Sequence, residues 1–506
     1  MLLQRLVEVS GAVAATRSRK EKTRLIAELL LAAQPQERSL VAHYLSGRLR
    51  QRRTGLGWRS LQALPAPAEE PTLEVVAVDA AFARMSELSG AGSAGARAAA
   101  VLELFGAATE AEQSWLRAVA VGEVRQGALE AVVTEAVASA AEVPSAAVRR
   151  AAMLAGGATY VVDAAFAGTA ALEAVGLTVG RPVLPMLASS APGVAAALVK
   201  AAGADGTVGI DAKLDGIRIQ VHRDGDDVLV ATRSLDDITH RLPEVVEIAR
   251  SLPAERFVLD GEALALAEDG RPRPFQETAS RTASVVGEGA AVVTPYFFDL
   301  LHLDGTDLID LPARDRWAAL DALVPEQHRV QRWIGSDAEE ASAFASSVLA
   351  AGREGVVVKS VAAAYDAGRR GSAWVKVKPV HTLDLVVLAV EHGSGRRRGW
   401  LSNIHLGAVD PDSPTGFTML GKTFKGMTDA MLAWQTERFR ELEVADGGWV
   451  VTVRPEQVVE IAFDGLQRST RYPGGLALRF ARVVRYRDDK GPGDADTLET
   501  VRSLLG

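Results

Sequence analysis

The chain contains no cysteine among its 506 residues. This absence excludes disulfide bonds, cysteine-ligated zinc and iron–sulfur sites, and thiol nucleophiles together. Its apolar runs are short and broken by charge, so none reaches the roughly 20 residues of a membrane-spanning helix. The first 22 residues lack the basic-then-apolar layout of a signal peptide and predict an amphipathic helix. We therefore expect a cytoplasmic protein with no membrane partner.

Basic residues are a minority, with 56 Lys and Arg against 64 Asp and Glu, and the formal net charge is −8. This balance argues mildly against nucleic acid as a partner, but phosphate binding depends on local basic patches and not on net charge. With 48% hydrophobic residues the chain can bury large cores. Its length predicts about three domains.

The first 180 or so residues are rich in Ala, Leu, Val and Glu and predict helices. In one of them Leu40, Tyr44, Leu45 and Leu49 recur at helical spacing. Several arginines follow, up to Arg52 and Arg53, and lead into a glycine turn at 54–57. Such an end could present charge and backbone amides to phosphates. Alternatively, it is a solvated helix end whose cations suit the helix dipole.

A proline-punctuated connector at 181–186 separates this helical region from one in which strands dominate. Beyond residue 382, short strands and glycine turns predict a five-stranded barrel of the OB type. We therefore predict a multidomain α+β protein. It has an all-helical domain at 1–185, an α+β domain at 186–381, and a C-terminal OB-fold β-barrel with a tail at 382–506.

The segment Asp211–Arg223 predicts a strand, a charged interruption and a second strand. Ile217, Ile219 and Val221 alternate with polar residues, which is typical of a half-buried strand. Lys213 lies at the interruption. A lysine that is held rigidly and partly desolvated can act as a nucleophile. The alternative is a solvated lysine beside an ordinary Asp-Gly hairpin turn.

Five further segments combine strand patterns with charged or aromatic residues: Arg233–Thr239, Phe257–Leu264, Tyr296–Leu301, Glu354–Lys359 and Trp374–Pro379. Each alone has a structural explanation, such as a core strand or lysines that protect a sheet edge. Together they supply a nucleophilic lysine, two carboxylates for a divalent cation, an aromatic face for a base, and cations for phosphates. Phosphoryl transfer requires this combination, because its catalysis is mostly positioning and charge neutralisation.

These motifs, in this order, resemble those of the ATP-dependent DNA ligases, most closely the bacterial and archaeal type with an N-terminal helical DNA-binding domain. KLDG is similar to the nucleotidyltransferase lysine motif, and RSLDD, LDGE, FFDL, EGVVVK and WVKVK are similar to the motifs that follow it. RFARVVRYRDDK resembles the C-terminal motif on the OB domain. The resemblance covers nearly the whole chain and implies that the α+β domain is a nucleotidyltransferase (ATP-grasp-like) domain.

The resemblance implies three chemical steps, with ATP and Mg²⁺ or Mn²⁺ as cofactors. Lys213 attacks the α-phosphate of ATP, the AMP passes to a 5′-phosphate at a nick, and the 3′-hydroxyl displaces AMP. Arg125–Ala128 lies where the family has a DNA-contact loop. The resemblance also implies that the partner is nicked double-stranded DNA. We expect binding without sequence specificity that weakens as salt is added. We expect a monomer in the bacterial cytosol, at the nucleoid.

By position in the family motifs, Lys213 is the catalytic residue and the nucleotide-binding residues are Asp211, Arg218, Arg233, Glu262, Phe298, Arg370, Lys376, Lys378, Arg487 and Lys490. Asp211 would face the adenine amino group and Phe298 would stack on the base. Glu262 and Glu354 would hold the metal. Arg487 and Lys490, with Asp489, would orient the leaving pyrophosphate. Asp211 stands where the family usually has the longer glutamate, and Ala212 where it often has an aromatic residue.

Four other activities are weighed against this one. A capping enzyme transfers GMP from a similar lysine, and an RNA ligase shares the same chemistry, but the helical N-terminal third argues against both. An NAD-dependent DNA ligase normally carries a cysteine zinc site, which this chain cannot form. A catalytically silent DNA-binding scaffold would not need the motif lysines, arginines and glutamates.

Overall fold

The computed structural model describes the backbone of residues 1–51, 54–127, 130–203, 206–267, 270–273, 275–283, 292–367 and 370–504. Contacts divide the chain into two compact units. The larger unit is Met1–Ser347, Ala351–Arg353 and Val357–Lys376; the smaller unit is Val348–Ala350, Glu354–Val356 and Val377–Gly506. The domain ranges 1–185, 186–381 and 382–506 stay predictions.

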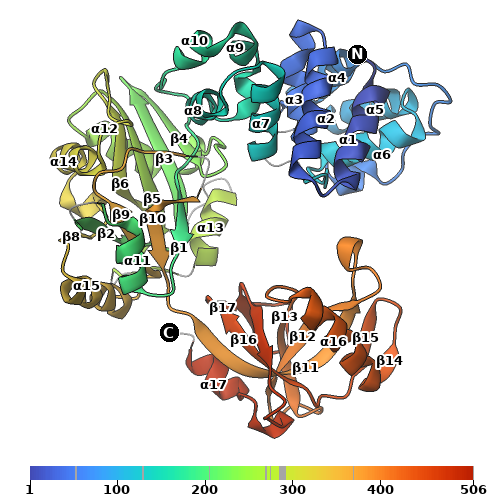
Figure 1. Ribbon diagram of the computed structural model, residues 1–506, viewed down its shortest axis with the longest axis vertical. Coiled ribbons are helices and arrows are strands. Elements are labelled where there is room, and N and C mark those ends of the chain that lie inside the picture. The colour runs from blue at the N-terminus through green and yellow to red at the C-terminus, as the bar shows by residue number, and fades with distance from the viewer. Residues whose placement is uncertain are drawn as a thin grey trace. The chain divides into compact units, whose positions relative to one another are not determined.

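The first part of the larger unit is helical, as predicted (Figure 1). Its α-helices are α1 (Leu3–Ala15), α2 (Arg19–Ala32), α3 (Arg38–Leu45), α4 (Val75–Glu87), α5 (Ser93–Gly106), α6 (Glu110–Ala120), α7 (Glu130–Ala140), α8 (Ser145–Ala155), α9 (Val162–Ala167) and α10 (Thr169–Glu173). The N-terminal helix is amphipathic, since Leu3, Leu6 and Val13 are fully buried along one face of α1. At the start of α6, the Thr109 side chain accepts a hydrogen bond from the backbone of Glu112, which caps the helix.

The helix predicted to run through Leu49 ends earlier. α3 stops at Leu45, and Gly47 follows with a φ of +76°, a left-handed conformation that terminates helices. Arg50 therefore lies beyond the helix, where it pairs with the buried carboxylate of Asp79. Arg52 and Arg53 lie outside the described residues. Arg50 is not at the end of a helix, so the macrodipole explanation is wrong for this residue.

The middle of the chain forms two five-stranded sheets with helices against them. The elements are β1 (Leu187–Ser190), α11 (Val194–Ala201), β2 (Val208–Lys213), β3 (Ile217–Asp224), β4 (Asp227–Thr232), α12 (Pro243–Ser251), β5 (Arg256–Ala265), α13 (Phe275–Ala283), β6 (Val293–Leu303), β7 (Thr306–Asp307), α14 (Ala313–Leu323), β8 (Arg332–Gly335), α15 (Ala338–Ala350), β9 (Gly355–Ser360) and β10 (Arg370–Val377). The strand orders are β1-β10-β9-β2-β8 and β4-β3-β5-β6-β7. Helices α12 and α14 contact the second sheet (Figure 1), where Phe257, Leu259 and Leu320 share a buried core.

Strand β3 is buried on both faces, so the prediction of a half-buried strand is wrong. Gln220 and His222, expected to be solvent-facing, are 4% and 1% exposed. The connector before β1 covers them: the Val183 N–H donates to Gln220 Oε1 (2.8 Å) and the Gly180 N–H donates to His222 Nδ1 (3.1 Å). Polar side chains on this strand therefore bind the backbone of the connector instead of water.

We expect this contact to weaken in acid. Burial lowers the pKa of His222 to about 3, below the roughly 6.5 of an unfolded histidine. The unfolded chain therefore takes up the proton more readily, and the contribution of His222 to stability is complete above pH 6.5 or so and decreases as the pH falls toward 3. The loss should approach about 1.4 kcal/mol per pH unit below 6.5. Urea unfolding of the wild type and of His222→Asn at two pH values measures this loss of stability. Equal pH dependence in the two proteins would contradict the assignment.

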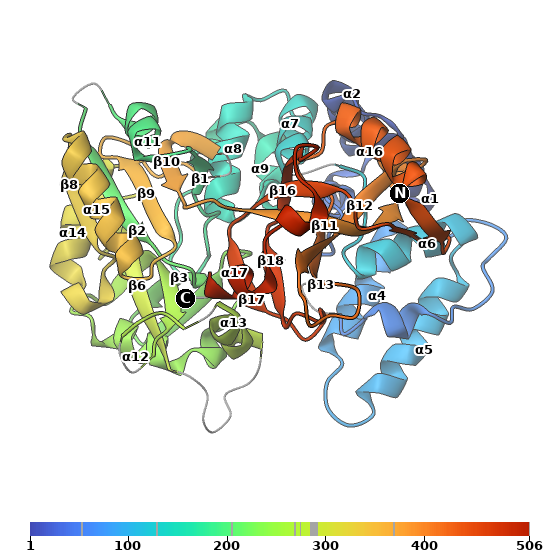
Figure 2. The ribbon, with the colours of Figure 1, turned by 90° about the horizontal axis from the view of Figure 1, so that it is seen from below.

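The C-terminal region is mostly β-structure, with a helix beside the sheet. Its elements are β11 (His381–His392), β12 (Leu401–Val409), β13 (Phe417–Thr423), α16 (Asp429–Glu441), β14 (Glu443–Asp446), β15 (Val450–Val453), β16 (Val458–Phe463), β17 (Gly465–Arg468), β18 (Leu476–Arg479), β19 (Arg482–Tyr486) and α17 (Leu498–Ser503). Helix α16 contacts β12 (Figure 2). The fold is OB-like, as predicted, but an open and larger sheet replaces the predicted five-stranded barrel. The main sheet has seven strands, and in the described chain its outer strands β13 and β14 are not paired with each other.

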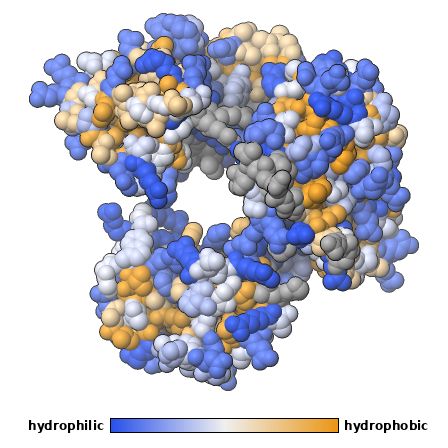
Figure 3. All heavy atoms as spheres, turned by 180° about the vertical axis from the view of Figure 1, so that it is seen from behind, coloured by the Kyte–Doolittle hydropathy of each residue, from blue (hydrophilic) through white to orange (hydrophobic). Residues whose placement is uncertain are grey.

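The long strand β11 has two partners along one of its edges. Its residues 381–386 pair with β16 and its residues 389–391 pair with β15, so one strand serves two neighbours along one edge. Of the helices in the described residues, none has an apolar stretch long enough to cross a lipid bilayer. On the face shown in Figure 3, hydrophilic residues surround small groups of hydrophobic ones.

Candidate functional site

Lys213 is the last residue of β2, where the chain leaves one sheet and enters the other at β3. Because β2 and β3 belong to different sheets, the Asp-Gly pair between them is not a hairpin turn, and the ordinary-hairpin alternative is wrong. The turn requires glycine: a Cβ on Gly216 would lie 2.3 Å from the carbonyl oxygen of Ala263. The Lys213 side chain is half-buried, and its Nζ donates to the carbonyl of Leu214 (3.3 Å).

Two residues before Lys213, Asp211 is the centre of a buried group of charges. Arg332 on β8 donates to both of its oxygens (2.5 and 2.9 Å), and the Nζ of Lys359 on β9 lies 2.6 Å from Oδ2. Burial raises the pKa of Asp211, but the two cations outweigh it and hold that pKa below its usual range. Burial lowers the pKa of Lys359, against the opposing effect of Asp211. This triad ties β2 to strands on either side of it.

Aromatic rings surround the same lysine. The Lys359 Nζ lies 4.5 Å from the ring centroid of Phe298 and 4.2 Å from that of Trp374, distances typical of cation–π contacts. The two rings meet edge to face, with centroids 5.8 Å apart. Phe298 is half-buried, whereas Trp374 is buried. The residue predicted to stack on adenine therefore lies beside the Asp211 triad.

Arg218, predicted to bind the nucleotide phosphates, is held by protein groups. Its guanidinium donates to both oxygens of Asp260 (3.1 and 2.7 Å) and to the carbonyl of Met186 (2.7 Å). The buried Tyr365 hydroxyl also donates to Asp260 (2.7 Å), and burial raises the pKa of that phenol well above its usual value. Any contact from Arg218 to a phosphate must therefore come from donors that remain, or replace one of these bonds.

The other predicted nucleotide-binding residues lie on separate elements. Arg233 is exposed after β4, Glu262 is half-buried on β5 opposite Arg218, and Lys376 is half-buried on β10. Lys378 directly follows Val377, the last residue of β10. The backbone of Arg370 begins β10, but its side chain lies outside what the structure describes.

In the smaller unit, Lys378 is ion-paired with Glu354, a predicted metal ligand, and lies 3.7 Å from Asp464. Arg487 and Lys490 both contact Asp384 on β11 (3.0 and 2.7 Å). Across the residues that the structure describes, no group of three or more His, Asp or Glu side chains is placed to hold a metal ion.

Several residues of this site were not predicted to act in it. Arg332, Tyr365 and Asp260 had no assigned role, and Lys359 was noted only as the base that ends its strand. Asp211 and Arg332 are 121 residues apart, and Tyr365 and Asp260 are 105 apart. The only available signal for Asp260 was its place beside Glu262 in the LDGE motif. No local pattern links the other residues.

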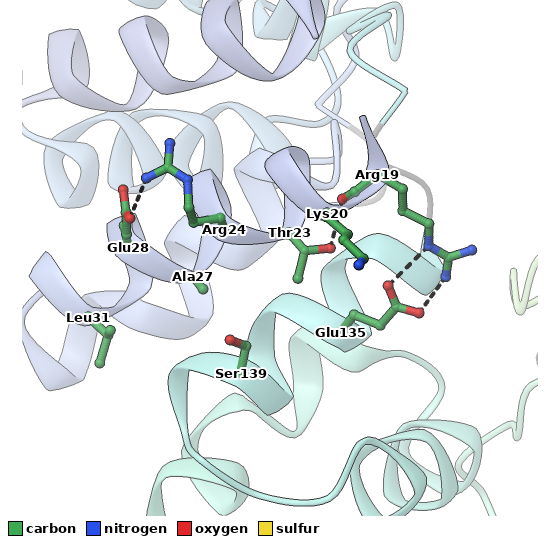
Figure 4. Close-up of a pocket in the computed structure, with 9 residues that line it drawn as sticks. All are labelled: Arg19, Lys20, Thr23, Arg24, Ala27, Glu28, Leu31, Glu135 and Ser139. Carbon is green, nitrogen blue, oxygen red and sulfur yellow. Dashed lines mark hydrogen bonds and ion pairs between the residues drawn. The ribbon is translucent and has the colours of Figure 1, made fainter. Parts of the chain in front are cut away.

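A separate open groove of about 740 Å³ lies between α2 and α7 (Figure 4). Its lining residues are Arg19, Lys20, Thr23, Arg24, Ala27, Glu28, Leu31, Glu135 and Ser139. The arginines are already paired, Arg19 with Glu135 (2.6 Å) and Arg24 with Glu28 (2.5 Å). Because both arginines already have carboxylate partners, we assign the groove no ligand.

A lysine at the junction of two sheets, followed by an OB-like sheet, defines a nucleotidyltransferase. Residues 185–378 match the family described as ATP dependent DNA ligase domain, and residues 397–490 match its C terminal region. A protein named "Probable DNA ligase" from Nocardioides sp. is 66% identical over 100% of this chain and 99% of its own length. One of the same name from Mycobacterium marinum is 57% identical over the full length of both. The chain belongs to the ATP-dependent DNA ligase family.

Solved structures show the same fold. The structure titled "Pmar-Lig_PreS3" superposes with a TM-score of 0.62 at 18% identity, over 95% of this chain and 99% of that one. The family resemblance inferred from the motifs and the order of helical, nucleotidyltransferase and OB-like regions are thereby confirmed. The chain is a ligase of a family that uses ATP.

Proposed function

We propose that this chain seals nicks in duplex DNA through a covalent AMP bound to Lys213. The observation that carries the proposal is the position of Lys213, at the end of a strand that the Asp211 triad holds in place. The Nζ attacks the α-phosphorus of ATP, an N–P bond forms, and the bond to the leaving pyrophosphate breaks. The 5′-phosphate of the nick then takes the AMP, and the 3′-hydroxyl displaces AMP as the phosphodiester forms.

The charges around Lys213 support this role. A lysine attacks as the neutral amine, and nearby cations favour that form. Lys376 and Lys378 would supply such charge and meet the phosphates, together with Arg218, Arg233 and Arg370. Phe298 would stack on adenine beside Asp211. Each assignment follows from the place of the residue in the family motifs.

Mg²⁺ or Mn²⁺ would neutralise the phosphates of ATP. Protein sites for Mg²⁺ commonly supply only one or two carboxylates and leave the other positions to phosphate and water. By their places in the family motifs, Glu262 and Glu354 would each supply a carboxylate to the ion. Both are half-buried, and Glu354 would first have to exchange its partner Lys378 for the ion.

The helical region is the proposed DNA-binding part, with contacts mainly to the phosphate backbone. In the predicted contact loop, Gln126 is buried and donates to the carbonyl of Leu45, while Lys22 Nζ donates to the carbonyl of Gln126 (2.5 Å). These bonds anchor the loop to α2 and α3 and leave its remaining residues for DNA. Ala128 lies outside the described residues. We propose a monomer that works in the bacterial cytosol at the nucleoid.

The test is incubation with α-labelled ATP and Mg²⁺, beside GTP and NAD, followed by denaturation and then by sealing of nicked duplexes of several sequences. We expect label from ATP alone and equal sealing of unrelated DNA sequences. Label from GTP would instead indicate a capping-type enzyme, and preference for an RNA nick would indicate an RNA ligase. If a folded, metal-replete sample takes no label from any donor, the proposed function is wrong.

A further inference from the structure

The basic groups at the end of the OB-like sheet are held by one carboxylate. Asp384, on β11, lies 3.0 Å from Arg487 Nη1 and 2.7 Å from Lys490 Nζ. Both cations belong to the set proposed to orient pyrophosphate. All of these residues are in the smaller unit, so the contacts do not depend on the placement of the two units.

All three guanidinium nitrogens of Arg487 donate to carboxylates. Its Nε and Nη2 donate to the two oxygens of Asp489 (2.8 and 2.7 Å), and its Nη1 donates to both oxygens of Asp384 (3.2 and 3.0 Å). The hydrogen bonds that Arg487 donates to Asp489, and then the charge of Asp384, raise the pKa of Arg487 above its usual value. To bind a phosphate with its fork, Arg487 must release one of these carboxylates.

Asp384 and Asp489 differ in how firmly they are placed. Asp489 is 63% exposed in the turn that carries Arg487, whereas Asp384 is 13% exposed. Two hydrogen bonds tie the Asp384 backbone to Asp496: its N–H donates to the Asp496 carboxylate (2.8 Å), and its carbonyl accepts from the Asp496 N–H (2.8 Å). Asp489 can move away with the turn, but Asp384 stays in the sheet. Asp384 also contacts both cations.

We propose that Asp384 sets the affinity of Arg487 and Lys490 for a polyphosphate by competing for them as a fixed internal anion. This inference rests on the proposed function, because the ligand is the triphosphate of ATP or the pyrophosphate that leaves. The carboxylate holds the two cations side by side when no phosphate is bound. A triphosphate carries more charge than one carboxylate and displaces it, so part of the binding energy is spent on breaking these ion pairs.

Removal of the charge at this position should strengthen binding. In the full-length protein, Asp384→Asn keeps the size of the side chain. We expect it to lower the KM for ATP in adenylate formation about fivefold, because Arg487 and Lys490 no longer have to release this carboxylate. Asp384→Glu keeps the charge and should not lower the KM. Sealing of a nick that already carries AMP should stay within about twofold, because no polyphosphate takes part.

Asp446→Asn is the matched control, since Asp446 pairs with Arg440 and His392 elsewhere in the smaller unit. An unchanged or raised KM in Asp384→Asn, or an equal change in sealing of the adenylated nick, would overturn the inference. Calorimetry with inorganic tripolyphosphate gives a second readout that needs no adenylation, and tighter binding by Asp384→Asn is expected. If wild type forms no adenylate, the proposed function fails; if it does and the KM stays unchanged, only this inference fails.

Discussion

Replacement of Lys213 with alanine should abolish the covalent adenylate and reduce nick sealing from ATP by at least about 1,000-fold, since removal of a nucleophile is among the largest catalytic losses. The Nζ is the only atom proposed to form the bond to the α-phosphorus. Transfer of label from α-labelled ATP to denatured protein measures the first step, and gel analysis of a nicked duplex measures the whole reaction.

Two matched variants show whether activity is lost with the nucleophile or with the positive charge of the lysine. Lys213→Arg keeps a cation but cannot lose its proton, so it should be as inactive as Lys213→Ala. Lys200→Ala removes a lysine whose Nζ donates to the backbone carbonyl of Ser190 (3.3 Å), and it should label like wild type. Sealing of a nick that already carries AMP should survive better in Lys213→Ala than sealing from ATP. Label retained by Lys213→Ala would show that another residue is the nucleophile.

Asp211→Ala should lower the free energy of unfolding by about 3–5 kcal/mol, because it leaves buried cations without their counter-charge. Lys359 and Arg332 have side chains that are 3% and 10% exposed, so water cannot replace the carboxylate. A loss of this size is a large part of the roughly 5–15 kcal/mol that stabilises a typical domain. Urea unfolding, monitored by a spectroscopic signal from the larger unit, gives the change in the free energy of unfolding.

Asp224→Ala provides the comparison. Asp224 pairs with Arg256 on neighbouring strands, but the two side chains are 56% and 47% exposed, and exposed pairs contribute about 0–1 kcal/mol. A cost for Asp211→Ala as small as that of Asp224→Ala would show that the triad is solvated. If the variant remains folded, its KM for ATP then tests whether Asp211 also contacts adenine.

Local patterns in the sequence account for most of the secondary structure. The amphipathic N-terminal helix, the break between β2 and β3 at Lys213, and the strands β11, β15 and β16 all follow from periodicity and turn residues. The errors arise where tertiary contacts override the pattern. Gln220 and His222 look solvent-facing by alternation, yet the connector supplies their hydrogen bonds. The Leu40–Leu49 periodicity continues past α3, but Gly47 turns the chain.

The sequence by itself determined the family and the candidate nucleophile, because motif order and spacing are linear properties of the chain. Only the tertiary structure decided which groups neutralise the motif charges. Arg332 and Lys359 contact Asp211, Tyr365 contacts Asp260, and Asp384 contacts Arg487. The two partners of each contact are more than 100 residues apart in the sequence. Burial makes an unpaired charge costly, so the fold must bring a partner to each one. No local pattern shows which distant residue that partner is.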